Sequence, residues 1–374
     1  MSTGRGATEV AVVGAGVVGL AVAAALARAG RAVTVLERRE APARETSARN
    51  SGVIHAGLYY PPGSWKARLC VAGREALYAR CAALGLPHRR TAKLVVATQE
   101  GEVADLEALR RRAEANGVPG LALVDGAEAA RLEPEVRCVA ALVSPQTGIV
   151  DPEALARSYA AEAERHGAQI VTRADVVPLA PRPGGFALRA RRPDGAEETL
   201  ACDAVVNAAG LGADRVAALA GLDVDARGWR QRPCKGDWFQ LVPGAPLRLR
   251  RLVYPLPAGA GLGIHATLDL AGRLRFGPDA EYVDAPRYDV DPSKAGAFAA
   301  SLRRWLPRLE AAWLAPEGAG IRPKLAGPGE GFRDFVIEEA SADGLPGLVN
   351  LLGIESPGLT AAPAIADRVA ALLR

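Results

Sequence analysis

The order of apolar and polar positions near the amino terminus predicts a strand, a helix and a second strand. Residues 10–13 are apolar and rich in valine, residues 20–27 are alanines, leucines and one valine, and residues 31–38 are again β-rich. A helical crossover this short joins neighbouring parallel strands. The uncharged run from Val10 to Ala27 has the length of a membrane span, but three glycines interrupt it after the first strand. We therefore interpret it as strand, tight turn and buried helix.

Later parts of the chain alternate between helical and extended patterns. Helical spacing and caps predict helices over residues 65–84, 102–116, 152–166, 292–306 and 360–373. Apolar runs predict strands over 92–98 and 348–353, short strands between 228 and 282, and a three-stranded meander over 169–177, 186–191 and 198–207. This succession predicts an α/β protein, in which a Rossmann-like nucleotide-binding domain accompanies a second α+β domain with a mixed, mostly antiparallel sheet.

Length and composition limit the class of protein. The chain has 374 residues, of which 49% are hydrophobic, enough for two or three domains and too apolar for a disordered protein. Its net charge of +4 is spread along the chain without a basic tract interleaved with aromatic residues, so we expect no nucleic-acid partner. The 5 cysteines form no C-x-x-C pair, which argues against a disulfide framework or a zinc site and favours a reducing cytosol.

The turn after the first strand carries a dinucleotide-binding pattern. Gly14, Gly16 and Gly19 form G-x-G-x-x-G between a strand and a helix, and Glu37 ends the next strand. In this pattern the first glycine permits a tight turn, the second lets a pyrophosphate approach the helix N-terminus, and the third allows the helix to pack closely. Glu37 suits the hydroxyls of an adenosine ribose and repels a 2′-phosphate. The pattern disfavours NADP and leaves NAD and FAD open.

A segment rich in serine, asparagine and glycine, residues 45–60, follows the second strand. It resembles the segment that wraps the flavin in the D-amino-acid-oxidase superfamily of flavoproteins. Further motifs make nearly the whole chain resemble the L-2-hydroxyglutarate dehydrogenase/oxidase branch of that superfamily: Asn207-Ala-Ala-Gly210, Lys235-Gly-Asp-Trp-Phe, Val253-Tyr-Pro-Leu-Pro, Gly261-Leu-Gly-Ile-His-Ala-Thr-Leu-Asp, Arg275-Phe-Gly-Pro-Asp-Ala, Gly320-Ile-Arg-Pro-Lys and Gly353-Ile-Glu-Ser-Pro-Gly-Leu-Thr. The resemblance favours FAD over NAD.

The resemblance implies an FAD-binding domain made of three separated segments, 1–85, 148–225 and 325–374, and a substrate domain made of 86–147 and 226–324. The N-terminus of the last predicted helix is expected to face the flavin and to stabilise the negative charge of its reduced ring. The residues that the resemblance assigns to cofactor binding are Gly14, Gly16, Val18, Gly19, Glu37, Arg38, Ser47, Arg49, Asn50, Ser51, Gly52, Val176, Ala209, Gly210, Gly353, Ser356, Gly358, Leu359 and Thr360.

The resemblance also implies oxidation of a 2-hydroxy acid, with L-2-hydroxyglutarate as the expected substrate. A base must take the hydroxyl proton while the Cα hydride passes to the flavin, and cations must hold the carboxylates. His265 is our first choice of base and His55 the second, although either residue also fits a structural role. The residues expected to hold the substrate are Arg322, Lys324, Tyr254 and Lys235.

Some of these assignments have equally plain alternatives. Tyr254 fits core packing as well as substrate binding. We expect only one of Arg322 and Lys324 to point inward, and we favour Arg322 because a guanidinium binds a carboxylate in bidentate fashion.

Two other functions compete with this one. A different oxidoreductase of the superfamily, acting on a secondary amine, an amino acid or glycerol 3-phosphate, would share every FAD motif; a non-catalytic or tRNA-modifying FAD protein is a weaker alternative. The electron acceptor, whether quinone, protein or oxygen, is left open by the sequence. We expect a cytoplasmic protein without a transmembrane segment, with peripheral contact at the inner face of the membrane as the alternative.

Overall fold

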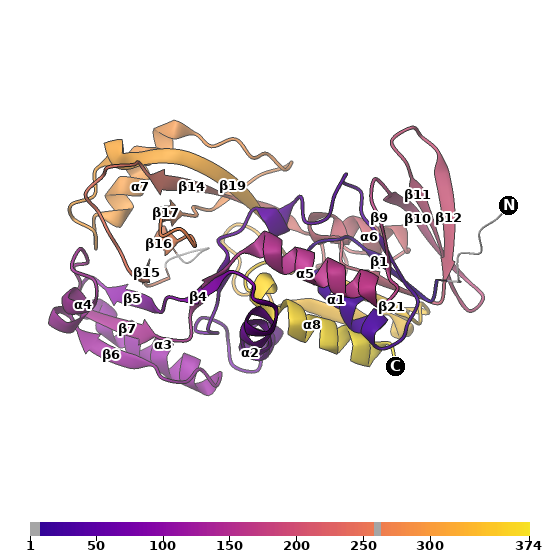
Figure 1. The fold of residues 1–374 in the computed structure, drawn as a ribbon, viewed down its shortest axis with the longest axis horizontal. Helices are drawn as coiled ribbons and strands as arrows, with labels where there is room; N and C mark the ends of the chain where they lie inside the picture. Colours follow the sequence, from indigo (N-terminus) through magenta and orange to yellow (C-terminus); the bar gives the residue numbers. More distant parts are fainter. Residues whose placement is uncertain (1–7, 258–262) are drawn as a thin grey trace.

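The computed structural model describes residues 8–257 and 263–374. Its two large sheets lie toward opposite ends of the long axis in Figure 1. The six-stranded sheet lies on the right with α1 (Val17–Arg28) and α8 (Gly358–Leu372), and the nine-stranded sheet lies on the left with α7 (Ala295–Leu302). Residues Gly261 and Leu262 of the motif around His265 lie outside the described residues.

The six-stranded sheet is built around the first predicted strand. Its strands are β1 (Val10–Val13), β2 (Val33–Leu36), β9 (Gln169–Val171), β13 (Ala204–Asn207), β20 (Val336–Glu339) and β21 (Leu348–Leu352). The order is β20-β21-β13-β1-β2-β9, and every neighbouring pair is parallel except β20 with β21. This is the doubly wound arrangement in which ligands bind beyond the carboxyl ends of the strands.

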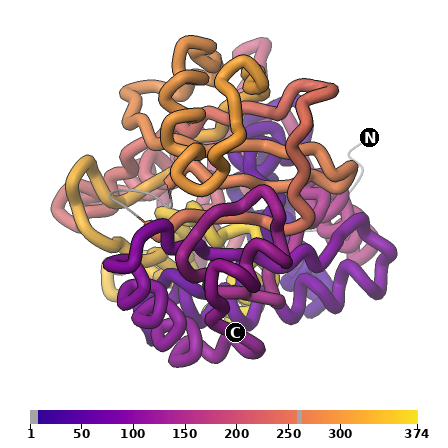
Figure 2. Tube along the Cα trace, turned by 90° about the vertical axis from the view of Figure 1, so that its left-hand side faces the viewer, coloured from indigo at the N-terminus to yellow at the C-terminus, as the bar shows by residue number. Residues whose placement is uncertain are grey.

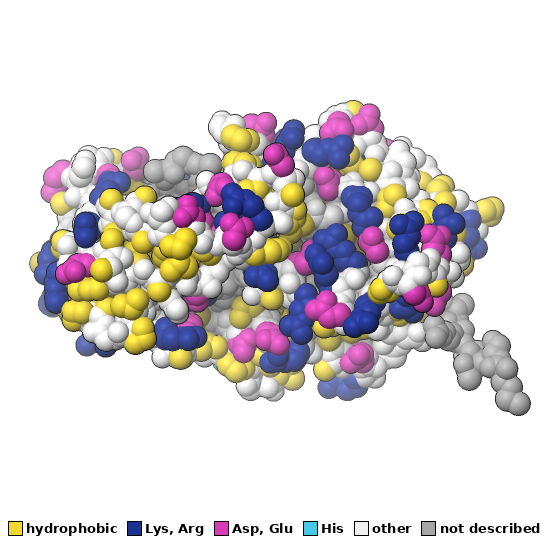
Figure 3. All heavy atoms as spheres, turned by 90° about the horizontal axis from the view of Figure 1, so that it is seen from above, with side chains coloured by type: hydrophobic (Ala, Val, Ile, Leu, Met, Phe, Trp, Pro, Cys, Tyr) yellow, Lys and Arg dark blue, Asp and Glu magenta, His cyan; other side chains and the backbone are white. Residues whose placement is uncertain are grey.

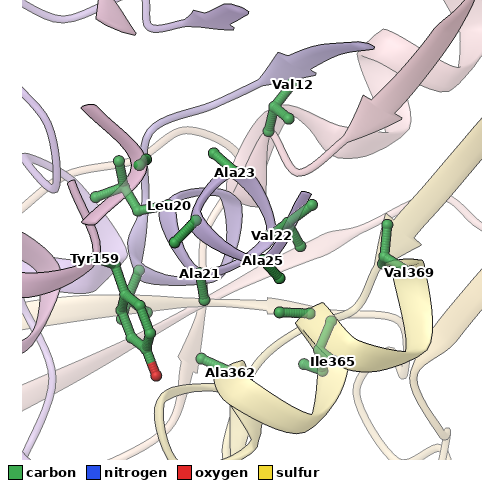
Figure 4. Close-up of a cluster of buried hydrophobic side chains, with 14 of the residues drawn as sticks. Val12, Leu20, Ala21, Val22, Ala23, Ala25, Tyr159, Ala362, Ile365 and Val369 are labelled. Atoms are coloured by element: carbon green, nitrogen blue, oxygen red, sulfur yellow. The ribbon is translucent and has the colours of Figure 1, made fainter. Parts of the chain in front are cut away.

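Four long helices form the core beside this sheet. Helix α1 is apolar on all sides and is buried between α5 (Pro152–Arg165) and α8, as Figure 4 shows. Helix α2 (Trp65–Leu84) packs on the other side of α8. Its bounds are those that the periodicity predicts, with Ser64 as N-cap and Gly85 in the left-handed conformation as the stop. The predicted N-cap Asp151 also accepts from two N–H groups of α5.

The predicted three-stranded meander exists, but two of its strands continue into the parallel sheet. The meander consists of β10 (Asp175–Arg182), β11 (Gly185–Arg191) and β12 (Glu197–Cys202). Predicted strand 169–177 breaks between β9 and β10, where Arg173 has a positive φ of 54°. Predicted strand 198–207 breaks at 203, after which β13 joins β1. Both breaks move the chain from one sheet to another.

The nine-stranded sheet combines two distant segments of the chain. Its order is β18-β14-β17-β16-β15-β5-β7-β6, and β19 pairs with β14 along their length. Figure 2 shows the two segments, purple and orange, on the same side of the molecule. The strands are β5 (Lys93–Ala97), β6 (Ala122–Asp125), β7 (Ala140–Ser144), β14 (Arg232–Leu241), β15 (Leu252–Pro255), β16 (His265–Leu268), β17 (Leu274–Gly277), β18 (Glu281–Tyr282) and β19 (Leu314–Lys324).

The remaining elements connect these layers. Predicted helix 292–306 is shorter than expected, because a 3-10 turn at Pro292–Lys294 leads into α7, which ends at Leu302. A small three-stranded sheet has the order β3-β8-β4. Its strands are β3 (Val53–Ile54), β8 (Gly148–Val150) and β4 (His88–Arg90). The other helices are α3 (Val103–Ala115), α4 (Gly126–Leu132) and α6 (Ala213–Leu219).

The surface carries both signs of charge. On the face drawn in Figure 3, Lys and Arg side chains are interspersed with Asp and Glu side chains. Within the described residues, no helix combines the length and the apolar character that a bilayer crossing requires.

Candidate active site

The turn between β1 and α1 requires glycine at two of the predicted positions. Gly14 has a φ of +102°, and a Cβ on it would lie 2.5 Å from the carbonyl oxygen of Ala208. A Cβ on Gly19 would lie 2.0 Å from the carbonyl oxygen of Gly14. The helix therefore approaches the turn closely because both residues lack a side chain.

Replacing Gly19 with alanine should destabilise the protein and lower its cofactor content. The added methyl group meets backbone atoms that cannot rotate away, so we expect a loss of about 1–3 kcal/mol of unfolding free energy. Gly296→Ala is the matched control, because Gly296 lies in α7 with nothing within 4 Å of its Cβ position. Urea denaturation and bound-flavin absorbance measure both effects. Equal stability of the two variants would contradict the close packing.

Side chains from later in the chain cap this turn. Ser47 Oγ accepts from the N–H of Val17 at 2.9 Å, which satisfies one donor at the N-terminus of α1. Glu37 Oε2 accepts from the N–H of Ala15 at 2.8 Å, and its Oε1 accepts from the N–H of Arg39. Glu37 is thus held at the carboxyl end of β2, beside the helix N-terminus.

A groove runs past these groups. Its walls include glycines without side chains, the end of β2, the start of β10 and the segment after β13; the lining residues are Val13, Gly14, Gly16, Leu36, Glu37, Arg38, Ala43, Arg44, Glu45, Thr46, Ser47, Ala174, Asp175, Val176, Ala208, Ala209, Gly210, Leu211, Gly212 and Arg215. Arg38 and Arg39 both bond to Glu45 at its rim. The helix N-terminus suits a pyrophosphate and Glu37 suits ribose hydroxyls, so the groove fits a dinucleotide.

The segment 46–60 leads from the groove to a second cluster of polar side chains. Asn50 bonds to the carbonyl of Ser47, and the N–H of Gly52 bonds back to Asn50. His55 follows β3 in the chain and lies against the first turn of α8. Its backbone N–H donates to Thr360 Oγ1 at 3.0 Å, and its ring Nε2 lies 3.2 Å from Ser356 Oγ. Burial is the main reason that the pKa of His55 is well below its usual value, and the charges of Lys93 and His265 lower it further.

One face of the nine-stranded sheet carries a row of aromatic and basic side chains, those of Lys93, Tyr254, His265 and Trp238. Residues paired across strands share a face, and the registers place His265 and Gly277 on the same face. The imidazole of His265 stacks on the ring of Tyr254 at 3.7 Å between centroids and meets the edge of Trp238 at 5.7 Å. Lys93 Nζ lies 3.9 Å from the centre of the Tyr254 ring. The row thus crosses the sheet from β5 to β14.

The hydrogen bond of His265 determines which ring nitrogen can accept a proton. Its Nδ1 lies 2.9 Å from the carbonyl oxygen of Gly263. A carbonyl oxygen only accepts, so Nδ1 carries the proton and Nε2 carries the lone pair. Burial, opposed by the Gly263 contact, lowers the pKa of His265 to about 3. The imidazole is therefore neutral at physiological pH and has an available acceptor.

Arg322 lies on the same face as this row and has no acidic partner among the described residues. It is the register partner of Cys234, which lies on the Trp238 side of β14. Its guanidinium donates to backbone carbonyls, including those of Lys235 at 3.0 Å and Asp279 at 2.6 Å. These neutral acceptors orient the group without neutralising its charge, which leaves it suited to bind an anion.

Lys235 points away from this face. Its Nζ lies 2.9 Å from Asp237 Oδ1, both side chains are buried, and Lys294 bonds to the other oxygen of Asp237. Neighbouring residues of a strand point to opposite faces, so Lys235 faces α7 while Cys234 faces the row. This corrects the sequence-based assignment: Lys235 is an ion-pair partner of Asp237, and we remove it from the proposed substrate site.

Lys324 also has a carboxylate partner. Its Nζ lies 3.1 Å from Glu355, which also pairs with Lys66 at 2.9 Å. Arg322 and Lys324 are two residues apart on β19 and share a face of the sheet, so the expectation that only one of them points inward is wrong. Burial opposes ionisation of Glu355, but the two ammonium groups hold the pKa of its carboxyl below the usual value.

Glu355→Gln should destabilise the folded protein at neutral pH. The substitution leaves two buried ammonium groups without a countercharge, which costs about 3–5 kcal/mol. Because the folded-state pKa of Glu355 is lowered, its contribution is present above pH 4.5 and is lost as the pH falls through that lowered value. Chemical denaturation between pH 7 and 3 should therefore show a difference that stays constant down to about pH 4.5 and becomes smaller below it. The exposed pair of Glu114 with Arg110 is the control, with an expected loss below about 0.5 kcal/mol for Glu114→Gln.

Comparison with known proteins assigns the chain. It matches the FAD dependent oxidoreductase family over residues 9–372. This chain belongs to that family. The mitochondrial L-2-hydroxyglutarate dehydrogenase of Arabidopsis thaliana is 38% identical over 97% of this chain and 82% of its own length, and that of Caenorhabditis elegans is 29% identical over 96% and 92%. The structure of dithionite-reduced L-alpha-glycerophosphate oxidase from Mycoplasma pneumoniae with FAD bound has a TM-score of 0.87 and 27% identity, covering 99% of this chain and 95% of that chain.

For this FAD-dependent oxidoreductase, several predictions are thereby confirmed. The α/β fold, FAD as the cofactor and the resemblance to L-2-hydroxyglutarate dehydrogenases all agree with the comparisons. The predicted cofactor residues that line the groove are Gly14, Gly16, Glu37, Arg38, Ser47, Val176, Ala209 and Gly210. Val18 and Gly19 lie inside α1, outside the groove lining.

The other predicted cofactor residues of the oxidoreductase follow two segments. Arg49, Asn50, Ser51 and Gly52 lead from the groove toward His55, and Gly353, Ser356, Gly358, Leu359 and Thr360 lie at the start of α8. Their roles toward the flavin stay predictions.

Sequence reasoning missed three side chains beside the histidines. They are Lys93, which contacts the rings of Tyr254 and Tyr59, then Tyr59 itself, and Trp238, which contacts His265. The available signal for Lys93 was a charged residue at the start of the apolar run Leu94–Ala97, a position that becomes buried only when β15 and β7 pair with β5.

Proposed function

We propose that this enzyme oxidises L-2-hydroxyglutarate to 2-oxoglutarate. The observation that carries the proposal is the neutral His265, with a free Nε2 lone pair, on the same sheet face as Arg322, a cation without an acidic partner. A base and a cation on the same face of the sheet suit a substrate that carries a hydroxyl and a carboxylate. The Arabidopsis and Caenorhabditis relatives named for this activity support the choice of substrate.

In the proposed reaction, Arg322 binds a substrate carboxylate and His265 Nε2 takes the hydroxyl proton. FAD, when bound, supplies the acceptor for the hydride that leaves Cα. Loss of the proton and the hydride leaves the C=O of the 2-oxo acid, so two electrons and two hydrogens are accounted for. His55 is the second candidate for the base, and its contact with Ser356 places it at the start of α8. Gly14, Gly16 and the N-terminus of α1 would hold the pyrophosphate.

A redox-dye turnover panel tests the proposed function. The purified holoenzyme should reduce the dye with L-2-hydroxyglutarate and respond weakly to D-2-hydroxyglutarate, glycerol 3-phosphate, glycine and proline. Turnover of glycerol 3-phosphate or an amino acid without turnover of L-2-hydroxyglutarate would overturn the substrate and favour the other superfamily activity. Acid precipitation should release the flavin into the supernatant, since we expect non-covalent binding.

We also propose that the electrons leave to a quinone or another protein more readily than to oxygen. The Arabidopsis and Caenorhabditis relatives are named dehydrogenases, which supports this choice. In air, hydrogen peroxide should form much more slowly than a quinone analogue is reduced. Equal rates would contradict the proposal.

The cysteines of this chain are free, which agrees with a reducing compartment, and we propose a cytoplasmic location.

A further inference from the structure

Lys93 differs from the other lysines of the chain. Only 1% of its surface is exposed, yet no carboxylate of the described residues lies within 4.0 Å of its Nζ. The other lysines all have such a partner, as the pairs Lys66–Glu355, Lys235–Asp237, Lys294–Asp237 and Lys324–Glu355 show. A buried ammonium group without a countercharge is costly, so this arrangement calls for a ligand that supplies the charge.

Two polar groups near Lys93 lack hydrogen-bond partners. The Nζ lies 5.1 Å from the centre of the Tyr59 ring, and the hydroxyl of Tyr59 is buried without a hydrogen bond within the described part of the chain. The same holds for Nδ1 of His55, whose pKa is lowered in part by the charge of Lys93. Unsatisfied buried polar atoms are rare, and two of them near an ammonium group that lacks a carboxylate indicate a ligand with several acceptor oxygens.

Lys93 and Arg322 approach His265 from opposite sides. In the sheet, β5 and β15 lie on one side of β16, and β17, β14 and β19 lie on the other. Burial is the main cause of the low pKa of His265, and the charges of both Lys93 and Arg322 contribute to it. The proposed base therefore lies between two basic side chains that have no acidic partner in the described residues.

We propose that Lys93 binds one carboxylate of the substrate while Arg322 binds the other, with the hydroxyl of Tyr59 as a second donor at the Lys93 end. The inference rests on the proposed function, because it requires a dicarboxylate. It identifies a substrate-binding residue, and it explains how the site distinguishes a dicarboxylate from a monocarboxylic 2-hydroxy acid: the shorter acid leaves the buried ammonium without a countercharge.

Binding should be coupled to uptake of a proton. Burial lowers the pKa of Lys93 to about 7, so above that pH the amine of the free enzyme is largely neutral. A carboxylate against Nζ favours the charged form and raises the pKa again. The titratable groups that face Lys93 have pKa values outside the range of pH 7 to 9: the pKa is lowered for His55 and His265 and raised for Tyr59, Tyr254 and Cys70. The other charged group on this face is the guanidinium of Arg322.

Glutarate binding to the holoenzyme tests this coupling. Glutarate has both carboxylates and no hydroxyl, so it binds without being oxidised. For the wild type, affinity followed by the flavin absorbance should fall roughly tenfold for each pH unit above 7, as expected when one proton must be taken up. Calorimetry at pH 8 in two buffers with different ionisation enthalpies should show that uptake directly.

Three variants separate the roles of charge and titration. Lys93→Met should bind glutarate at least about tenfold more weakly at pH 7 and lose the pH dependence. Lys93→Arg keeps a permanent charge, so it should bind glutarate with little dependence on pH up to 9. Arg322→Met is the matched control: its affinity should fall while the proton uptake persists, because Lys93 is intact. Bound-flavin absorbance confirms that each variant is folded.

The outcomes distinguish this inference from the proposed function. If the wild type oxidises L-2-hydroxyglutarate but Lys93→Met and Lys93→Arg retain its glutarate affinity and pH profile, the inference is wrong and the function stands. Retained pH dependence in Lys93→Arg alone would also overturn it. A wild type that neither binds glutarate nor oxidises L-2-hydroxyglutarate would overturn both.

Discussion

The His265→Gln enzyme should oxidise L-2-hydroxyglutarate at least about 100-fold more slowly than the wild type at saturating substrate, because it lacks the group that takes the hydroxyl proton. The KM should change little, since the carboxylate-binding residues remain. The groove that fits the dinucleotide lies beside the six-stranded sheet, away from His265, so the flavin content should match that of the wild type. Dye-coupled kinetics and the flavin-to-protein absorbance ratio measure these quantities.

His88 provides a matched control for this substitution. It also makes a hydrogen bond from Nδ1 to the carbonyl oxygen two residues before it, that of Leu86, but it lies on β4, away from the row. His88→Gln should therefore keep the wild-type kcat. If His265→Gln keeps a near-normal kcat and His55→Gln loses it, the base is His55 and the assignment of His265 is wrong.

Arg322→Met should lower kcat/KM for L-2-hydroxyglutarate roughly 30-fold to several thousandfold, which corresponds to a loss of about 2–5 kcal/mol of transition-state stabilisation. The reason is that a substrate carboxylate loses its partner in a site removed from water. Arg275→Met is the comparison. Arg275 lies over the ring of Trp238, but its charge is already paired with Glu317 at 2.6 Å. Its removal should cost less than about 1 kcal/mol in the same quantity. Equal losses in the two variants would show that Arg322 has no specific role.

The first βαβ unit could be predicted well because local chemistry determines it. Gly14 and Gly19 have close backbone neighbours that no side chain would permit, and the alanine-rich run can only form a buried helix. The bounds of α2 were predictable for the same reason. Ser64 caps the start of the helix with a hydrogen bond from a backbone N–H, and Gly85 ends the helix by adopting a positive φ.

Features that depend on distant partners could not be predicted in this way. Residues 198–207 read as one strand, yet the chain leaves the meander at 203 because β13 pairs with β1 and β21. The long strand β19 contains Pro316 and Pro323, which weaken a strand signal, and it is held by β14 along its length.

The same limit applies to the candidate site. The sequence shows that Lys235 and Arg322 belong to extended segments, but only the register between β14 and β19 shows that they face opposite sides of the sheet. The burial of Lys93 likewise depends on pairing with β15, which lies far along the chain.

The burial of α1 against α8 has a consequence for biosynthesis. Helix α1 is made early, but α8, which covers part of its apolar surface, begins only at Gly358. A ribosome-bound chain must therefore carry α1 partly uncovered until nearly all of the described residues have been synthesised. The layer formed by α1 and α8 therefore cannot be completed before α8 is made, and until then the nascent chain is a natural client for chaperones that bind exposed apolar helices.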